Sequence, residues 1–186
     1  MTRVIAGRLR GRRIHAPKGS GTRPTSDRAR EALFSALVAR GAVDGARVLD
    51  LYAGSGALGI EAVSRGATGA VLVDHDRGAV GAMRRSLAEL DLTEGEVRVQ
   101  ARAVDAYLRG EASPVDLVFL DPPYPLTEEA LADNLAALAD GWLADGALVV
   151  VERSVRSPEP RWPAGLEPVL DRRYGEARIW VAEHVP

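Results

Sequence analysis

The stretch that decides the fold combines the end of a strand, a glycine-rich loop and the start of a helix: Asp50-Leu51-Tyr52-Ala53-Gly54-Ser55-Gly56-Ala57-Leu58-Gly59. Glycines here let the chain turn tightly and let a ligand approach the backbone, while the first helical turn offers N–H groups without intrahelical partners. The G-x-G-x-x-G pattern is weak evidence alone, but between a strand and a helix it is typical of nucleotide-binding α/β folds. The expected ligand contacts are Asp50, Tyr52, Ala53, Gly54, Ser55, Gly56 and Gly59.

Strands and helices alternate on both sides of this loop. Apolar runs predict strands at 48–52, 70–73, 97–101, 115–120 and 147–151, and amphipathic stretches predict helices at 57–65, 77–90, 104–108 and 127–138. The short connections indicate a parallel sheet covered by helices on both faces. Two more strands, at 166–174 and 177–184, flank Gly175 and indicate an antiparallel hairpin. The sequence therefore predicts an α/β fold with a mostly parallel, seven-stranded sheet.

The tetrapeptide Asp121-Pro122-Pro123-Tyr124 follows the apolar run 115–120. Two successive prolines cannot extend a sheet ladder, so the chain has to leave the sheet at this point. Open α/β sheets bind their ligands at the carboxyl ends of their strands. Taken alone, the tetrapeptide is equally consistent with a plain turn after a core strand and with a binding site.

Asp74 ends the second strand of the alternation, twenty positions after Gly54. A carboxylate there can accept hydrogen bonds from both hydroxyls of a ribose, so we assign that role to Asp74 and the start of the next helix to Asp76. Asp50 precedes the glycines, where it would repel a diphosphate but attract the ammonium and sulfonium groups of S-adenosylmethionine. The loop therefore favours S-adenosylmethionine over a nicotinamide or flavin dinucleotide, although its spacing fits both.

Charge is distributed unevenly along the 186 residues. Residues 1–40 hold ten Lys and Arg, nine of them Arg, against two Asp and Glu, whereas residues 41–186 hold 14 basic and 24 acidic residues. Arg suits bidentate phosphate contacts, so a basic part attached to an acidic body indicates a nucleic-acid partner, the alternative being a solvated surface. The expected phosphate contacts are Arg10, Arg12, Arg13, Arg23 and Arg28.

The basic N-terminal part has its own structural pattern. Apolar and basic residues alternate around glycines over 3–14, which predicts one or two short strands, with a hairpin as one arrangement. One of the residues 25–27 can cap a helix, with Arg28, Arg30 and Glu31 largely off its apolar side. That apolar side comprises Ala29, Leu33, Phe34, Leu37 and Val38. We expect an RNA-binding extension at 1–40 and a cofactor-binding catalytic domain at 41–186.

Composition excludes several classes of site. The chain contains no cysteine, which rules out disulfides, thiolate zinc sites and cysteine nucleophiles. His15, His75 and His184 are far apart without ligand spacing, so no metal is expected. No apolar stretch approaches the ~18 residues that span a membrane, and no signal core follows the basic N-terminus. We expect a cytoplasmic monomer.

The glycine loop, Asp74 and the tetrapeptide together resemble the Rossmann-like class I methyltransferases, which use S-adenosylmethionine. Asp121-Pro122-Pro123-Tyr124 resembles the (Asn/Asp/Ser)-Pro-Pro-(Tyr/Phe) motif of members that methylate amino nitrogens. The N-terminal segments 10–12 and 23–34 resemble the RsmD family, which methylates N2 of a guanine in 16S ribosomal RNA. The resemblance runs along nearly the whole chain.

This resemblance implies roles for the tetrapeptide. The exocyclic amine of guanine is a poor nucleophile, because its lone pair is delocalised into the ring. Asp121 Oδ and the Pro122 carbonyl can accept hydrogen bonds from its N–H groups, the prolines holding the loop rigid. Tyr124 can stack on the base. The implied partner is 16S rRNA, free or within an assembling small ribosomal subunit.

One position departs from the family pattern. Members often carry Asp or Asn followed by Ala shortly after the third strand, near the adenine of the cofactor. Alignment on Tyr107-Leu108 places Ala103 there, and Asp105-Ala106 follows two residues later. Asp105 is therefore the candidate adenine contact in this chain.

Three other functions remain open at this level. An amino-methyltransferase could act on adenine N6 of DNA or on a protein glutamine, and the tetrapeptide alone excludes neither. A noncatalytic RNA-binding module would need neither the intact glycines nor the tetrapeptide. A dinucleotide oxidoreductase would share the glycine loop.

Overall fold

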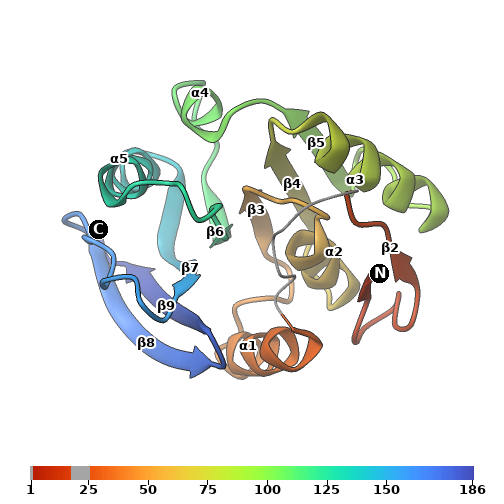
Figure 1. Ribbon diagram of the computed structural model, residues 1–186, viewed down its shortest axis with the longest axis horizontal. Coiled ribbons are helices and arrows are strands. Elements are labelled where there is room, and N and C mark those ends of the chain that lie inside the picture. Colours follow the sequence, from red (N-terminus) through yellow and green to blue (C-terminus); the bar gives the residue numbers. More distant parts are fainter. Residues whose placement is uncertain (1, 18–25) are drawn as a thin grey trace.

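The computed structural model describes residues 2–17 and 26–186, which fold around a seven-stranded sheet of order β5-β4-β3-β6-β7-β9-β8 (Figure 1). The parallel part comprises β3 (Arg47–Leu51), β4 (Gly69–Asp74), β5 (Val97–Ala101), β6 (Val115–Leu120) and β7 (Leu143–Ser154). The hairpin of β8 (Leu166–Tyr174) and β9 (Ala177–His184) adds an antiparallel edge. The predicted fold class, strand count and C-terminal hairpin are confirmed.

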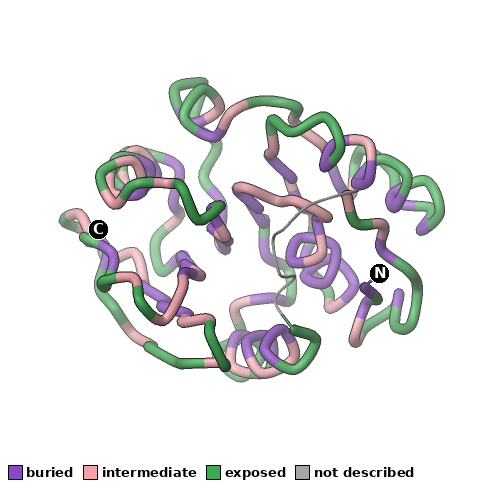
Figure 2. The backbone as a smooth tube through the Cα atoms, viewed as in Figure 1, coloured by how far each residue is buried: buried purple, intermediate pink, exposed green. Residues whose placement is uncertain are grey.

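Helices cover both faces of the sheet. One face carries α1 (Asp27–Ala39), α2 (Ala57–Ser64) and α3 (Arg77–Glu89), and the other carries α4 (Val104–Leu108) and α5 (Glu128–Ala139). Each face has its own hydrophobic cluster, because successive strand residues point to opposite sides. Figure 2 shows the buried chain gathered along the strands and on α2. None of the helices in the described part of the chain is long and apolar enough to cross a membrane.

Strand β7 differs most from its predicted range, because it begins at Leu143 rather than at residue 147. Leu143 pairs with Val115 at the start of β6, and a register shift then separates this pair from the regular ladder that begins at Leu117 and Leu148. The extra residues include Asp145 and Gly146, which hid the beginning of the strand from an apolar pattern. The other predicted elements of the sheet and its helices agree within two residues.

The N-terminal residues form a small sheet of their own, in which β1 (Thr2–Arg3) pairs antiparallel with β2 (Arg13–Ile14). The predicted hairpin is therefore confirmed. Val4, Leu9 and Ile14 are buried in the same hydrophobic cluster as the helices on that face of the main sheet. Residues on both sides of position 40 thus share one core, and the division into 1–40 and 41–186 stays a prediction about function.

Helix α1 corrects two sequence-based expectations. Ser26 is its N-cap, with Oγ accepting a hydrogen bond from Ala29 N at 3.2 Å, and the predicted apolar side is buried except for Val38, which is 51% exposed. Arg30, expected largely off that side, is 1% exposed. Its guanidinium reaches between the N-terminal sheet and α2, where Thr2 Oγ1 and the Arg3 carbonyl accept hydrogen bonds.

Candidate active site

The candidate site lies where the strand order reverses, at the carboxyl ends of β3 and β6. The chain runs outward from β3 through β4 to β5, then returns to the other side of β3 to form β6 and β7. Leu51 and Leu120, the last residues of β3 and β6, are in register. The loops that follow them therefore start side by side, at the kind of crevice in which open α/β sheets bind ligands.

The glycine loop is held in a left-handed conformation at several positions. Tyr52 has a φ of 59°, Gly54 of 57° and Gly56 of 75°. Left-handed backbone costs a non-glycine residue about 1 kcal/mol or more, so Tyr52 has to be held by its surroundings. Asn134 on α5 does so, donating a hydrogen bond from Nδ2 to Tyr52 Oη at 2.6 Å.

Glycine is needed at positions 54, 56 and 59 for different structural reasons. A Cβ on Gly56 would lie 2.8 Å from Leu72 Cδ1, and one on Gly59 would lie 2.3 Å from Leu72 Cδ2. Both therefore let α2 pack closely against β4. A Cβ on Gly54 would meet only Tyr52 O, at 4.0 Å. Gly54 is thus needed for its positive φ, and the space above it suits a ligand that approaches the backbone.

Asp50 anchors the start of α2 from inside the protein. It is 1% exposed, and its Oδ2 accepts a hydrogen bond from Gly59 N at 2.9 Å. Burial raises the pKa of Asp50, the Gly59 hydrogen bond lowers it and the nearby Asp74 carboxylate raises it, and the result is a pKa of about 8. A cation placed next to this loop would favour the charged form of Asp50.

This raised pKa makes stability depend on pH. Because the folded pKa of Asp50 is about 8 and the unfolded value is about 3.9, the folded state binds the extra proton between these values, and the free energy of unfolding falls as pH rises through that window. The slope is at most about 1.4 kcal/mol per pH unit. Urea unfolding of the ligand-free protein from pH 5 to 8 should show this loss, and Asp50→Asn should reduce it.

The exposed Asp133 provides the control for this prediction. Asp133→Asn makes the same chemical change on the surface of α5, and it should leave the pH slope of wild type unchanged. Equal slopes for wild type and Asp50→Asn would contradict the assignment.

Asp74 joins the glycine loop to the end of β4. Its Oδ2 accepts a hydrogen bond from Gly54 N and its Oδ1 from Asp76 N, each at 2.9 Å. Asp76 in turn is the N-cap of α3, accepting from Ala79 N at 2.8 Å, which confirms the helix-start role predicted for it. A carboxylate has about four acceptor positions, so Asp74 retains capacity for ribose hydroxyls.

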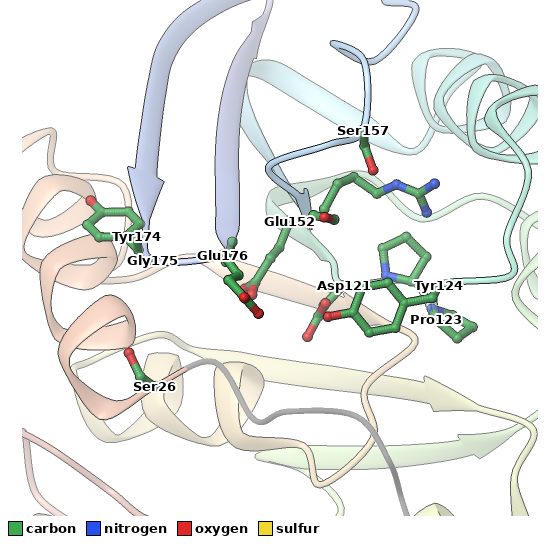
Figure 3. A pocket seen from close by; sticks show the side chains of 13 residues that line it. Ser26, Asp121, Pro123, Tyr124, Glu152, Ser157, Tyr174, Gly175 and Glu176 are labelled. Carbon is green, nitrogen blue, oxygen red and sulfur yellow. The ribbon is translucent and has the colours of Figure 1, made fainter.

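The tetrapeptide lines a pocket of about 290 Å³ (Figure 3). This volume lies near the lower end of the range for small-molecule sites, which begins at about 300 Å³. The other walls come from the end of β7, the β8–β9 turn and Ser26 at the start of α1. Asp121 points into the pocket, while Tyr124 is 66% exposed beside it. An exposed ring at a pocket edge suits stacking on a planar ligand.

The charge state of Asp121 is set by its neighbours. Removal from water raises the pKa of Asp121 well above its ordinary value, and the carboxylates of Glu152 and Asp50 raise it further, while Arg153 lowers it. Arg153, buried at the end of β7, donates hydrogen bonds to the Leu126 carbonyl at 3.0 Å and to the Glu128 carboxylate at 2.6 Å. It thereby fixes the segment after the tetrapeptide against the sheet.

Sequence reasoning missed three polar residues of this region: Asn134, Glu152 and Arg153. Asn134 lies on the apolar side of α5 with Leu131, Leu135 and Leu138, and a buried amide on such a side indicates a specific partner. Glu152 and Arg153 follow the apolar run of the fifth strand, in the same place as Asp121 on the fourth. Their position after a strand, like that of Asp121, was the signal that could have marked them as site residues.

The remaining predicted contacts lie on the surface. Asp105 is exposed in the first turn of α4 and binds Arg109 at 3.0 Å, and this hydrogen bond lowers the pKa of Asp105. Its proposed contact with adenine stays a prediction. The predicted phosphate contacts Arg10, Arg12, Arg13 and Arg28 are all exposed, and Arg12 Nη2 donates to the Glu89 carbonyl. Arg23 lies outside the described residues.

Comparison with known proteins agrees with this geometry. Residues 2–183 match the family described as conserved hypothetical protein 95. Ribosomal RNA small subunit methyltransferase D of Escherichia coli K12 is 41% identical over 163 residues, covering 87% of this chain and 79% of its own. The chain belongs to the ribosomal RNA small subunit methyltransferase D family. The Haemophilus influenzae protein of the same name is 33% identical over 84% of this chain and 80% of its own.

Solved structures agree with membership of the methyltransferase D family. The Escherichia coli protein yhhF superposes with a TM-score of 0.87 at 35% identity, over 98% of this chain and 97% of its own. Magnesium protoporphyrin IX methyltransferase from Synechocystis, solved with bound S-adenosylmethionine, is 19% identical with a TM-score of 0.66, covering 84% of this chain and 78% of its own. That likeness shows the fold alone. The chain is a methyltransferase with the class I fold.

Proposed function

We propose that this methyltransferase transfers a methyl group from S-adenosylmethionine to the N2 amine of a guanine in small-subunit (16S) ribosomal RNA. The observation that carries this proposal is the register of β3 and β6, which places the glycine loop beside the Asp121–Tyr124 tetrapeptide and its pocket. The curated relatives named as small-subunit rRNA methyltransferases support the choice of polymer.

The residues around the glycine loop fit S-adenosylmethionine. The open space above Gly54 admits a ligand close to the backbone, and Asp74 at the end of β4 has acceptor capacity for ribose hydroxyls. Asp50 and Asp121 make the surroundings acidic, which suits a cofactor with an ammonium and a sulfonium group. The cofactor supplies a methyl group already activated by its positive sulfur, so the proposal includes no metal.

The tetrapeptide binds and orients the amine. Asp121 Oδ and the Pro122 carbonyl accept hydrogen bonds from the two N–H groups of guanine N2, which localises the nitrogen lone pair and directs it toward the methyl group. Tyr124 stacks on the target base. To reach the pocket, the base has to leave any RNA helix in which it is paired. The N–C bond forms as the S–C bond breaks, and the proton then lost from N2 passes to Asp121 or to water.

The exposed N-terminal arginines bind RNA phosphates in this proposal. Replacing Arg10, Arg12 and Arg13 together by Ala is expected to weaken RNA binding and to flatten its salt dependence, by about one unit of slope for each phosphate that the variant no longer binds. Filter binding across a salt series measures both quantities.

A control for this arginine prediction lies elsewhere on the surface, beside the amino end of β3. Arg40 borders a depression next to the amino end of β3, away from the tetrapeptide, and Arg47 is the first residue of β3, where it binds Asp116. Replacing both by Ala should leave the salt slope as in wild type. An unchanged affinity and slope in the N-terminal variant would contradict the phosphate contacts.

Labelled S-adenosylmethionine tests the proposed function directly. The protein is incubated with small ribosomal subunits, free rRNA, DNA and a protein extract in parallel, and label is expected in N2-methylguanosine of the rRNA. The small size of the basic part favours the assembled subunit as the better substrate. Label in DNA adenine or protein glutamine would replace the proposed substrate. No label anywhere, with no cofactor binding by calorimetry, would leave a noncatalytic RNA-binding module.

A further inference from the structure

We propose that Glu152 determines base specificity by accepting a hydrogen bond from N1–H of the target guanine, next to the N2 amine held by Asp121. This inference rests on the proposed function and adds a residue that reads the base. Glu152 lies near the end of β7 and lines the tetrapeptide pocket, and neither the sequence motifs nor the cofactor loop assigns it a role.

The sheet itself places the two carboxylates together. Leu120 of β6 and Val151 of β7 are in register, so the next residues along, Asp121 and Glu152, follow at neighbouring positions. Side chains alternate along strands, which puts these two on the same side, opposite to Leu120 and Val151. Figure 3 shows both carboxylates directed toward the same cavity.

Glu152 is also held firmly by its backbone. It pairs in register with Ile179 of β9, one residue after the ladder with β6 ends at Val151. Its sequence neighbour Arg153 points the other way and is bound to Leu126 and Glu128. A side chain on such a rigid strand can hold an acceptor in a fixed place relative to Asp121.

The donor pattern of guanine matches this pair of acceptors. On its Watson–Crick edge, guanine offers N1–H directly beside the N2 amine, so two adjacent donor groups face the pocket. Adenine offers its amine beside N1, which is an acceptor and would face the oxygen of a carboxylate. Enzymes that take a base out of its stack read it by hydrogen bonds to this edge. Asp121 and Glu152 side by side therefore fit guanine and reject adenine.

The electrostatics of the ligand-free pocket agree with this arrangement. Two neighbouring carboxylates disfavour each other's charge, and Glu152 contributes to the raised pKa of Asp121. Glu176, from the β8–β9 turn, also points into the pocket, and Arg153 opposes the effect of the acids on Asp121. Two N–H groups of a bound guanine would place positive hydrogen-bond donors next to the two carboxylates and so reduce this repulsion.

The experiment changes the base and the protein together. Small subunits are assembled with semi-synthetic rRNA that carries guanosine or 2-aminopurine riboside at the mapped target position. 2-Aminopurine keeps the 2-amine but has an unprotonated N1, so wild type is expected to prefer guanosine by about 100-fold or more in kcat/KM. In Glu152→Gln the amide can turn its N–H toward N1, and the preference should fall at least tenfold.

Glu176→Gln is the matched control, since it removes the same charge from the exposed edge of the same pocket. It should keep the wild-type preference for guanosine. Calorimetry with S-adenosylmethionine should give wild-type affinity for both variants, which separates base reading from cofactor binding.

Several results would overturn the inference. One is a Glu152→Gln variant that keeps the wild-type preference for guanosine. If only its pH profile changes, the inference is overturned as well, because Glu152 would then act on Asp121 by charge alone. Equal rates of wild type on the two bases would overturn it whether or not the variant folds. Methylation of guanosine by wild type would still uphold the proposed function in each case, and its absence would remove both.

Discussion

Asp121→Ala is expected to lower methyl transfer by about 10³-fold while the fold and the affinity for S-adenosylmethionine stay close to wild type. Asp121 points into the pocket at the end of β6, beside the glycine loop but in a separate segment of chain. Its loss removes one of the two acceptors that orient the amine, whereas the backbone contacts of the glycine loop are unchanged. Single-turnover transfer to small subunits measures the rate, and calorimetry measures cofactor affinity.

Asp121→Asn is the matched variant. Asn occupies the same position in the tetrapeptide of related amino-methyltransferases and keeps one acceptor oxygen, so it should retain more activity than Ala. Because the pKa of Asp121 is raised, wild-type activity should increase with pH as this carboxyl loses its proton and becomes a full acceptor. The Asn variant should lose that rise. Near-wild-type turnover in Asp121→Ala would contradict the role of the tetrapeptide.

Glu61→Ala should destabilise the protein by about 4 kcal/mol, a loss of roughly 10 °C in Tm for a chain of this size. Glu61 is fully buried on α2, and its carboxylate accepts hydrogen bonds from Ile5 N at 2.8 Å, Ala6 N at 3.0 Å and Arg65 Nε at 2.8 Å. Its removal leaves the partly buried N–H groups of Ile5 and Ala6 without their acceptor and takes away the carboxylate 3.8 Å from Arg30 Nε. Urea unfolding measures the loss.

Glu31→Ala is the control for this prediction. Glu31 also binds Arg65, at 2.6 Å, but its side chain is 46% exposed. Water can replace the interaction there, so the loss should stay below about 1 kcal/mol. Similar losses for the two variants would contradict the view that Glu61 fixes the N-terminal sheet to the rest of the protein.

The fold could be predicted because its strands and helices differ clearly in periodicity. The ranges 97–101, 104–108, 115–120, 166–174 and 177–184 agree with the structure to the residue. The strands among these ranges are buried or paired over nearly their whole length, so the apolar pattern and the turn residues mark both ends. The predictions for Arg30 and Val38 on α1 were wrong, because Arg30 is buried and Val38 is exposed. The burial of Arg30 depends on partners such as Glu61, far away along the chain, which the local pattern of one helix does not contain.

The candidate site was predictable where a residue type has one dominant structural use. The glycines, the paired prolines and the capping Asp76 are of this kind. Asn134, Glu152 and Arg153 are polar residues whose meaning comes from the neighbouring strand or helix. Asn134 binds Tyr52, 82 positions away, and Glu152 lies beside Asp121 because Val151 and Leu120 are in register. Only the assembled sheet brings such pairs together.

Mapping the methyl groups of small-subunit rRNA tests the central claim most directly. Ribosomal RNA from cells that lack this protein is digested and analysed by mass spectrometry, with wild type and Asp121→Ala supplied back on a plasmid. One N2-methylguanosine should disappear in the deleted strain, return with wild type and stay absent with Asp121→Ala. A complete set of N2-methylguanosines in the deleted strain, or full restoration by Asp121→Ala, would contradict this account.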